Sequence, residues 1–561
     1  MERKTYLSIW GVVFLLIVTI GLRLLFINSD FWYDEACSWV TALQAFPIGI
    51  MDNLLNLDLQ HTPLYFFMLH FWMKIFGDSE VAIRSLSLLF GVATVPLVYL
   101  LTKKLSSGLN AVFATCVASV APLLVFFSVE ARMYPIVLVW VLLSLISLAN
   151  FDKNKDKKAL VCLVVFNLLI PYTFVGGILY NITLLLSYSI YLFLSKKDYL
   201  LAYVKAVGLE LLCLIPYFAL VFYYAKLRVL FIVKHEGPFE FMHFVDAIRN
   251  FFGLNPVNNV YWPSVEPYVI TLGFALLVLV PCVYFLYGFV QGFKNSKGFN
   301  KFLYVFIVFI LLEFLITAVL QINVFTVRYM LYLLPPLFIL SIIGLSEKLS
   351  PVHMKLFIAL YCVVAICVNI DYSMRVPGYK TLAYKSVKIE ADKLGLDKRD
   401  VIIMPFGADA PYYFRDENSP RVLPFDFHKE VRNPYNKVYY DKAQQEKVLK
   451  GETSQMIYDA VFSNSGFSDS HFNFFINNVN RYVQKGRYVM IALYGSDAAA
   501  LVPIEDLRKS ITSVQDVKDR SLDIMLKKYL FDIRAYLDFD FELVKYGPKD
   551  NYTYILMKKR L

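Results

Sequence analysis

Two adjacent carboxylates, Asp34 and Glu35, follow the first apolar run of the chain, within the segment Phe31–Ser38. A carboxylate at the membrane–water boundary is costly to hold there, so it marks a position where the negative charge is used. On a helix or a strand, neighbouring side chains point in different directions. We therefore expect separate roles for the two acids, with Glu35 orienting a neighbouring group or balancing a cation.

Three further loops carry polar clusters on the side of the membrane where the predicted topology places Asp34. Their polar residues are His61, Glu130, Arg132, Tyr134, Arg328 and Tyr329. A guanidinium offers forked donors to phosphate oxygens and stays charged at an apolar boundary. Together these loops can hold an anionic lipid head group against an acceptor while the lipid tail stays in the bilayer.

The composition requires a membrane. Of the 561 residues 58% are hydrophobic and only 18% are charged, and the mean hydropathy is +0.54. A soluble protein of this size does not need so much apolar surface, so most of the chain is expected to lie in lipid. The seven cysteines show no paired or metal-ligand spacing, so we interpret them as small apolar residues. The net charge of +10 is already explained by its uneven distribution between the loops. It is therefore no sign of nucleic-acid binding, and we expect no nucleic-acid partner.

The elements that position these loops are membrane-spanning helices, which need about 20 apolar residues each. Apolar runs near that length, about eleven in all, occur at residues 6–27, 82–101, 109–127, 134–149, 159–175, 177–194, 203–224, 267–290, 302–321, 329–346 and 356–371. The shorter run Pro63–Phe76 is expected to form a helix in the membrane interface. No small-residue cleavage site precedes Asp34, so the first run is predicted to be a retained span.

Lysines gather in alternate loops, at residues 103–104, 153–158, 196–197, 294–301 and 348–355. The positive-inside rule then places the N-terminus in the cytoplasm and the loops with the polar clusters outside. An odd number of spans puts everything after about residue 372 outside as well. Residues 373–561 contain 30 Lys and Arg and 25 Asp and Glu. We therefore predict a transmembrane module at 1–372, with a first outward loop at 28–81, and a soluble domain at 373–561.

The soluble domain is predicted to be α/β. Buried strands are expected at 401–404 and 488–493, and a closing hairpin at 541–546 and 552–557 around Gly547-Pro548. Helical periodicity occurs near 380–395, 441–463 and 515–537. The predicted fold class is therefore an α-helical polytopic membrane protein with a C-terminal extracytoplasmic α/β domain.

At the residues of these loops the chain resembles the GT-C membrane glycosyltransferases. The branch concerned, glycosyltransferase family 39-like, contains the protein O-mannosyltransferases and the lipid A aminoarabinose transferase. The motifs are Trp-Tyr-Asp-Glu-Ala after the first span, His-Thr-Pro-Leu-Tyr at 61–65, the segment 76–87, Glu-Ala-Arg-Met-Tyr at 130–134 and Arg-Tyr-Met-Leu-Tyr-Leu-Leu-Pro-Pro at 328–336. They are dense over residues 1–150 and return at 325–346, and their order and topology together carry the resemblance.

The resemblance implies an inverting transfer of a hexosyl or pentosyl group from a polyprenyl-phosphate sugar, of the undecaprenyl type, at the outer face of a bacterial cell membrane. The acceptor would be a lipid, a glycan or a protein, and membrane lipids would surround the spans. Asp34 matches the family's catalytic acid position, where it accepts or orients the proton of the attacking hydroxyl, with Glu35 as its catalytic neighbour.

The leaving phosphate gains charge as the glycosidic bond breaks, so nearby cations stabilise the transition state. Arg132 and Arg328 are expected to hold that phosphate. Further donor-binding candidates are His61, Tyr134, Tyr329, Lys226 and Arg228. A divalent cation is a possible cofactor because some related folds use one, but the sequence identifies no ligands.

Other interpretations are open at several of these residues. Ala36-Cys37 departs from the arginine-containing continuation of the aminoarabinose transferase, which argues against a lipid A acceptor. Asp34 could simply cap a helix at Glu35–Phe46, and Glu35 could balance the dipole of that helix. The arginines could snorkel to the interface, His61 could be a turn residue, and His70 is interpreted as a packing residue.

Two other functions are compatible with a polytopic membrane protein. A transporter or flippase of lipid-linked sugars commonly shows repeat symmetry and charges near the midplane, whereas here the charges gather at one face and no repeat is found. A membrane anchor for the C-terminal domain leaves the clustered loops unexplained. The glycosyltransferase is therefore the favoured prediction.

Overall fold

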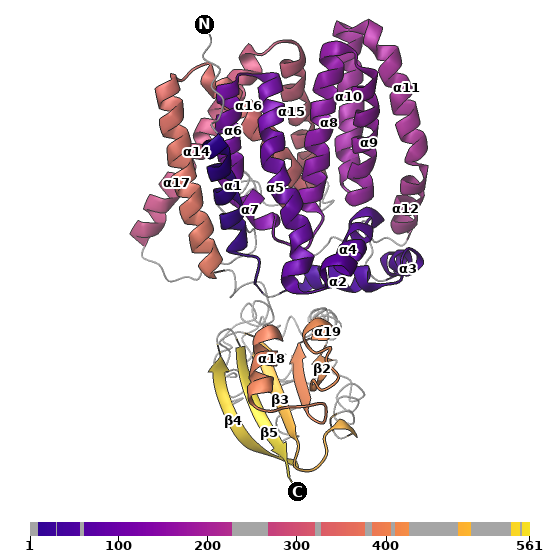
Figure 1. Ribbon diagram of the computed structural model, residues 1–561, viewed down its shortest axis with the longest axis vertical. Coiled ribbons are helices and arrows are strands. Elements are labelled where there is room, and N and C mark those ends of the chain that lie inside the picture. Colours follow the sequence, from indigo (N-terminus) through magenta and orange to yellow (C-terminus); the bar gives the residue numbers. More distant parts are fainter. Residues whose placement is uncertain are drawn as a thin grey trace, which may run out of the picture. The chain divides into compact units, whose positions relative to one another are not determined.

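The computed structural model describes residues 9–29, 31–56, 61–226, 268–319, 327–375, 384–405, 410–425, 479, 481–494, 540–549 and 552–560. This part of the chain forms two compact units, one of residues 1–29 and 37–379 and the other of residues 30–36 and 380–561. Figure 1 shows the first as a bundle of long helices and the second as a sheet with helices beside it.

The helices before residue 376 are α1 (Ile9–Leu24), α2 (Tyr33–Leu43), α3 (Ile48–Asn56), α4 (Pro63–Phe76), α5 (Glu80–Leu105), α6 (Gly108–Val120), α7 (Pro122–Phe127), α8 (Tyr134–Asn154), α9 (Lys157–Thr173), α10 (Gly177–Ser195), α11 (Lys197–Cys213), α12 (Ile215–Lys226), α14 (Tyr268–Asn295), α15 (Gly298–Val319), the 3₁₀ helix η1 (Val327–Leu333), α16 (Leu334–Ser346) and α17 (Pro351–Arg375). Each of the eleven predicted apolar runs overlaps one of these helices or a consecutive pair of them.

The number of helices long enough to span a membrane is smaller than the number of apolar runs. Within the described residues, six helices are long and apolar enough to cross a membrane, and a seventh span results if α11 and α12, which meet at 45°, count as one. Pro122 follows α6 and has no N–H to continue its hydrogen bonds, so the predicted run 109–127 is broken into α6 and α7. The multi-pass helical class is confirmed, and the count of eleven stays a prediction.

Local signals in the sequence explain where the long helices begin. The hydroxyl of Ser79 accepts a hydrogen bond from the N–H of Ala82 at the start of α5, and Ser107 and Asp156 cap α6 and α9 in the same way. Pro63 begins α4 exactly where the sequence predicts, because proline lacks the N–H that a first turn leaves unpaired.

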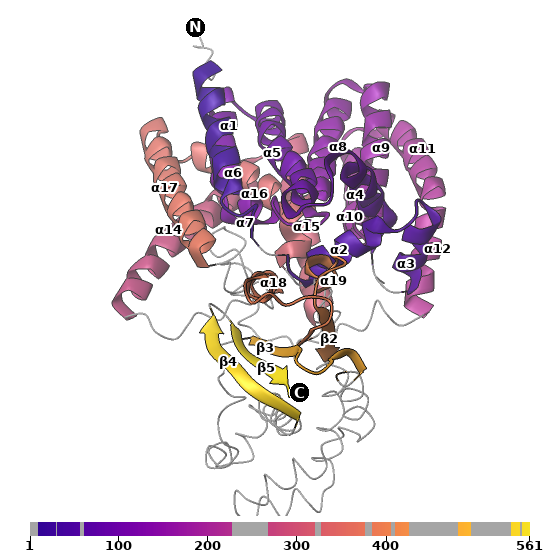
Figure 2. The same ribbon diagram turned by 60° about the horizontal axis from the view of Figure 1, so that its bottom comes forward.

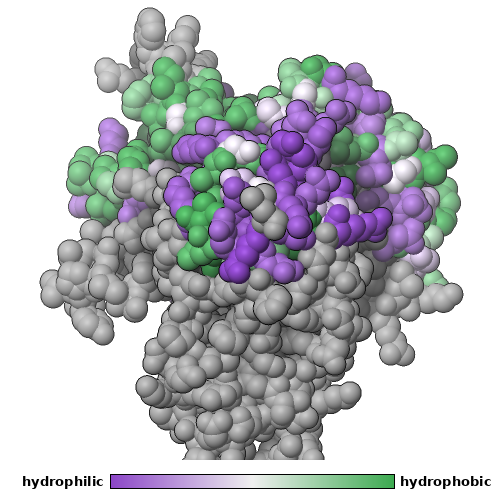
Figure 3. Space-filling model, turned by 90° about the horizontal axis from the view of Figure 1, so that it is seen from below, coloured by the Kyte–Doolittle hydropathy of each residue, from purple (hydrophilic) through white to green (hydrophobic). Residues whose placement is uncertain are grey.

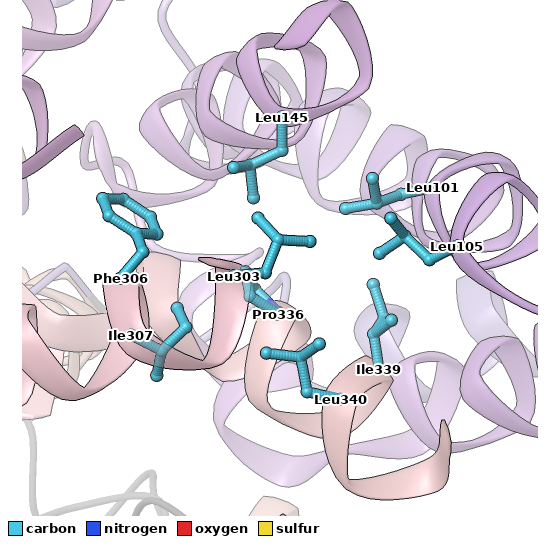
Figure 4. Close-up of a pocket in the computed structure, with 9 residues that line it drawn as sticks. All are labelled: Leu101, Leu105, Leu145, Leu303, Phe306, Ile307, Pro336, Ile339 and Leu340. Carbon is cyan, nitrogen blue, oxygen red and sulfur yellow. The ribbon is translucent and has the colours of Figure 1, made fainter. Parts of the chain in front are cut away.

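Apolar packing accounts for the rest of the bundle. Figure 4 shows one such region, where side chains from α5, α8, α15 and α16 meet and every lining residue is apolar. At the α14–α16 crossing, a Cβ on Gly344 would lie 1.9 Å from the carbonyl oxygen of Gly288, so only glycine allows this approach. Large apolar side chains such as Phe14, Leu194, Phe222 and Val352 are exposed, as expected of surfaces that face lipid.

Helices α2, α3 and α4 are short and group together beside the ends of the long helices α8–α12 in both ribbon views (Figures 1 and 2). Helix α4 packs against α5 and α9. Figure 3 shows hydrophilic and hydrophobic groups of side chains both exposed on the described residues in a view from below. The candidate residues of the sequence lie on α2, ahead of α4, and on the connections that start α8 and α16.

The second unit contains a five-stranded sheet of order β2-β1-β3-β5-β4. Its elements are α18 (Tyr384–Lys393), β1 (Val401–Pro405), α19 (Ala410–Tyr413), β2 (Arg421–Phe425), β3 (Tyr488–Tyr494), β4 (Phe541–Lys549) and β5 (Tyr552–Lys559). Strands β2, β1 and β3 are parallel, and β5 and β4 add to them antiparallel. Tyr384 and Val387 of α18 pack on Ile402 and Met490, so this unit is α/β as predicted.

Two details of the sheet differ from the predictions. The hairpin of β4 and β5 exists, but β4 continues through Gly547-Pro548, which pair with Tyr554 and Thr553. Because β4 is an edge strand, Pro548 costs the sheet no interior hydrogen bond. The same reason explains β2, an edge strand with Pro424 that the sequence did not predict. The helices expected at 441–463 and 515–537 lie outside the described residues.

Candidate active site

Helix α2 carries both candidate carboxylates in its first turn. The helix begins at Tyr33, two residues earlier than predicted, and ends at Leu43, so Asp34 is inside it and the interpretation of Asp34 as the cap is wrong. Glu35 is fully buried, and its Oε2 accepts a long hydrogen bond, 3.4 Å, from the N–H of Trp32. This contact from the third helical residue back to the cap satisfies a backbone donor that the first turn leaves unpaired.

Asp34 is partly exposed and lies one turn before Ser38 on the same helix. Residues four apart share a helix face and are separated by about 6 Å along its axis. Asp34 and Ser38 therefore lie close together on α2. Glu35 comes one residue after Asp34, so its side chain is turned about 100° round the helix axis from that of Asp34, and it is buried whereas Asp34 is partly exposed. Separate roles for the two acids stay a prediction.

The far end of α2 is held by its neighbours. Thr41 Oγ1 donates a 3.0 Å hydrogen bond to Asn53 Oδ1 of α3, and His70 Nδ1 of α4 lies 2.7 Å from the carbonyl oxygen of Ala42. Because a carbonyl only accepts, His70 Nδ1 carries the proton and donates. His70 is buried and stacks on Phe46, so it packs as predicted and also fixes α2.

The connection between α7 and α8 carries Arg132, the cation that contacts α2. Ser128, Glu130, Arg132 and Met133 are all buried although the segment is not helical. Arg132 Nη1 donates to Ser38 Oγ at 3.1 Å, and Nη2 lies 2.6 Å from His61 Nε2. Arginine has no acceptor, so the Nε2 of His61 accepts and is unprotonated. Arg132 thus joins α2 to His61, two residues before the start of α4.

An aromatic group continues from Arg132 along the start of α8. The ring of Tyr134 lies 6.4 Å from Tyr329 of η1 and 6.4 Å from Phe174, and Phe174 lies 5.4 Å from Tyr329. The guanidinium of Arg328 lies 5.2 Å from the ring of its neighbour Tyr329. Arg132 and Arg328 are therefore on two connections that meet through Tyr134 and Tyr329.

The structure thus brings together His61, Arg132, Tyr134, Arg328 and Tyr329 in the membrane unit, within hydrogen-bonded and ring contacts. Lys226 ends α12 but its side chain is not described, and Arg228 lies outside the described residues. Ser38 was not predicted as a site residue. Its position four residues after Asp34 was a signal that could have identified it. Among the described residues, no group of three His, Cys, Asp or Glu side chains has the arrangement of a metal site.

Comparison with known proteins shows what this chain is similar to. The family model of dolichyl-phosphate-mannose-protein mannosyltransferases matches residues 60–224, which include His61, Arg132 and Tyr134. The structure of ArnT from Cupriavidus metallidurans bound to undecaprenyl phosphate matches with a TM-score of 0.51 and 10% identity, over 98% of each chain. The chain has the fold of the GT-C membrane glycosyltransferases. The resemblance drawn from the motifs is therefore confirmed.

Two other structures with the GT-C fold match along nearly the whole chain. ArnT from Cupriavidus metallidurans in the apo state matches with a TM-score of 0.50 and 10% identity, over 98% of this chain and 97% of that one. The apo oligosaccharyltransferase from Archaeoglobus fulgidus matches with a TM-score of 0.50 and 12% identity, over 100% of this chain and 89% of that one. No curated protein sequence matches.

Proposed function

We propose that this chain is an integral membrane glycosyltransferase that uses a polyprenyl-phosphate sugar as donor. The observation that carries the proposal is the buried guanidinium of Arg132, which lies between Ser38 of α2 and His61. A buried arginine with forked donors matches the oxygens of a phosphate or a carboxylate, and a polyprenyl-phosphate sugar carries a phosphate. The ArnT structure that contains undecaprenyl phosphate has the same fold, which supports a lipid phosphate as part of the donor.

In the proposed reaction, the carboxylate of Asp34 accepts the proton of an acceptor hydroxyl as its oxygen attacks the anomeric carbon. The bond from that carbon to the phosphate oxygen breaks, and its electron pair leaves with the polyprenyl phosphate. Attack opposite the leaving group inverts the anomeric centre. Asp34 lies on the face of α2 that carries Ser38, the partner of Arg132, so one helix would position both base and cation.

The developing charge on the leaving phosphate is where Arg132 and Arg328 would act. Donors already held in place cost no reorganisation when the charge appears. His61, Tyr134 and Tyr329 would line the donor next to them, and Glu35 would hold the first turn of α2 in shape. The alternating lysine-rich loops support an outward-facing site, with the C-terminal unit on the same side of the membrane.

The proposal is tested with purified protein in detergent and a series of undecaprenyl-phosphate sugars, by following loss of donor with mass spectrometry. We expect the wild type to consume one donor, slowly with water and faster with its acceptor, and Asp34→Asn to be inactive although folded. Asp52→Asn is the matched control, because Asp52 is an exposed acid on the adjacent helix α3. Binding of donors with no turnover, even with membrane extract as a source of acceptor, would instead indicate a transporter.

A further inference from the structure

A second buried arginine, Arg23, lies in the last turn of α1 and belongs to no motif that the proposed function uses. Its side chain is fully buried. Nε donates to Ser128 Oγ at 3.0 Å, and Nη1 donates to the carbonyl oxygens of Thr19 at 2.9 Å and Ser119 at 3.1 Å. Arg23 therefore connects α1, the end of α6 and the segment 128–133 that carries Arg132.

Among the residues that the structure describes, no acid forms an ion pair with Arg23. All of its hydrogen-bond partners in the described chain are neutral oxygens, and Nη2 has no partner there. A cation buried without an acid in a membrane protein is expensive and is a functional-site hypothesis by default. Apolar residues of similar size often replace buried charges without loss of stability, so stability alone does not explain an arginine at this position.

The contact with Ser128 occurs where the segment 128–133 lies close to α5. A Cβ on Gly91 of α5 would lie 2.3 Å from both Cβ and Oγ of Ser128. One turn earlier on α5, Ser87 Oγ donates a 2.9 Å hydrogen bond to the carbonyl oxygen of Arg132. Helix α5 therefore holds both ends of the segment, and Arg23 holds its first residue from the side of α1.

We propose that Arg23 is a positioning residue that sets the place of Arg132 through Ser128 and the segment 128–133. This inference rests on the proposed function, in which Arg132 binds the phosphate of the lipid donor. Arg23 does not touch the phosphate. Its hydrogen bond to Ser128 holds the first residue of a segment that is not helical, and its bonds to Thr19 and Ser119 hold Arg23 itself on α1 and α6. The guanidinium of Arg132 thereby keeps one position between Ser38 and His61.

The first test measures the binding of undecaprenyl phosphate by native mass spectrometry to the wild type, Arg23→Met, Arg132→Ala and the double variant. Loss of a hydrogen bond from a charged group corresponds to about tenfold in affinity. We expect Arg23→Met to bind about tenfold more weakly than the wild type. In the Arg132→Ala background the same substitution should change affinity less than about twofold, because Arg23 acts through Arg132.

Two variants separate this role from a general effect on folding. Ser128→Ala removes the acceptor of Arg23 Nε and keeps the arginine, and it should weaken binding in the same direction. Arg415→Met makes the same chemical change in the C-terminal unit, at an exposed arginine, and should leave binding unchanged. The thermal midpoint of Arg23→Met should stay at or above that of the wild type, since the substitution removes a buried charge that meets only neutral oxygens in the described part of the chain.

Amide hydrogen exchange over residues 128–133 gives a readout that does not depend on any ligand. We expect faster exchange there in Arg23→Met and Ser128→Ala than in the wild type. Unchanged exchange would overturn the inference whatever the binding data show. An equal loss of affinity in the presence and absence of Arg132 would overturn it too. If wild-type protein fails to bind undecaprenyl phosphate while exchange responds as expected, the proposed function fails and the positioning of the segment stands.

Discussion

Replacing Arg132 by lysine keeps the positive charge at the candidate site and removes the pair of terminal nitrogens that the guanidinium holds side by side. In the structure the two terminal nitrogens of Arg132 reach different partners, Ser38 Oγ at 3.1 Å and His61 Nε2 at 2.6 Å. A lysine has a single ammonium group on a flexible stem and cannot reach both partners in this geometry. One charge-assisted hydrogen bond is then lost, which corresponds to about 1.5–3 kcal/mol.

That free energy corresponds to a fall of about tenfold to a hundredfold in kcat/KM for the donor. The assay is loss of donor at limiting donor concentration, with the thermal midpoint measured in parallel. Ser38→Ala and His61→Ala each remove one partner and should show smaller losses than Arg132→Ala. If Arg132→Lys kept the wild-type kcat/KM, the forked contact would have no part in donor binding. A lower thermal midpoint with unchanged kcat/KM would make Arg132 structural.

The remaining predictions concern stability. Glu210→Ala should cost about 1–3 kcal/mol and lower the thermal midpoint by several degrees, because the side-chain amides of Asn167 and Asn181 both donate to Glu210 inside the bundle. The Glu210→Gln variant keeps one acceptor and should lose less stability. Equal thermal midpoints for the wild type and both variants would contradict this prediction. Gly344→Ala should cost about 1–3 kcal/mol or more by separating α14 from α16, measured as loss of monodisperse protein in detergent, and normal yield would show that the helices can move apart. A hydrogen bond from Arg399 holds the pKa of Asp397 well below its usual range. This pairing therefore stabilises the folded C-terminal unit above about pH 4, and the stabilisation is lost as the pH falls toward the folded pKa. Between pH 6 and 3 the thermal midpoint should fall less in Asp397→Asn than in the wild type, by a small margin because the pair is solvent-exposed.

The sequence predicted the elements whose causes are local. Serine and aspartate caps, the proline at the start of α4 and the long apolar runs act over a few residues, and the helices begin close to where these signals stand. The strands β1 and β3 were found because they are short and continuously apolar. Edge strands were less predictable, since proline is tolerated mainly at the edge of a sheet, and Pro424 and Pro548 lie on β2 and β4, the outermost of the described strands.

For the candidate site, too, the residue types could be predicted from the sequence but their contacts could not. The residue types around Asp34, His61, Arg132 and Arg328 were recognisable because charged groups at an apolar boundary are rare. Which partner each would meet was not, because Ser38 and Arg132 are 94 residues apart and only the packing of α2 against the segment 128–133 joins them. Arg23 resembled an ordinary basic residue at the end of a span until the structure showed it buried on Ser128.

The most direct test of the account compares wild type, Asp34→Asn and Asp52→Asn for turnover of undecaprenyl-phosphate sugars by purified protein. We predict that the wild type and Asp52→Asn consume the same donor and release undecaprenyl phosphate at similar rates. Asp34→Asn should release none while it still binds undecaprenyl phosphate with wild-type affinity, because in the proposed reaction the arginines, and not Asp34, hold the phosphate. Turnover by Asp34→Asn at the wild-type rate would contradict the assignment of the base and the reaction proposed around it.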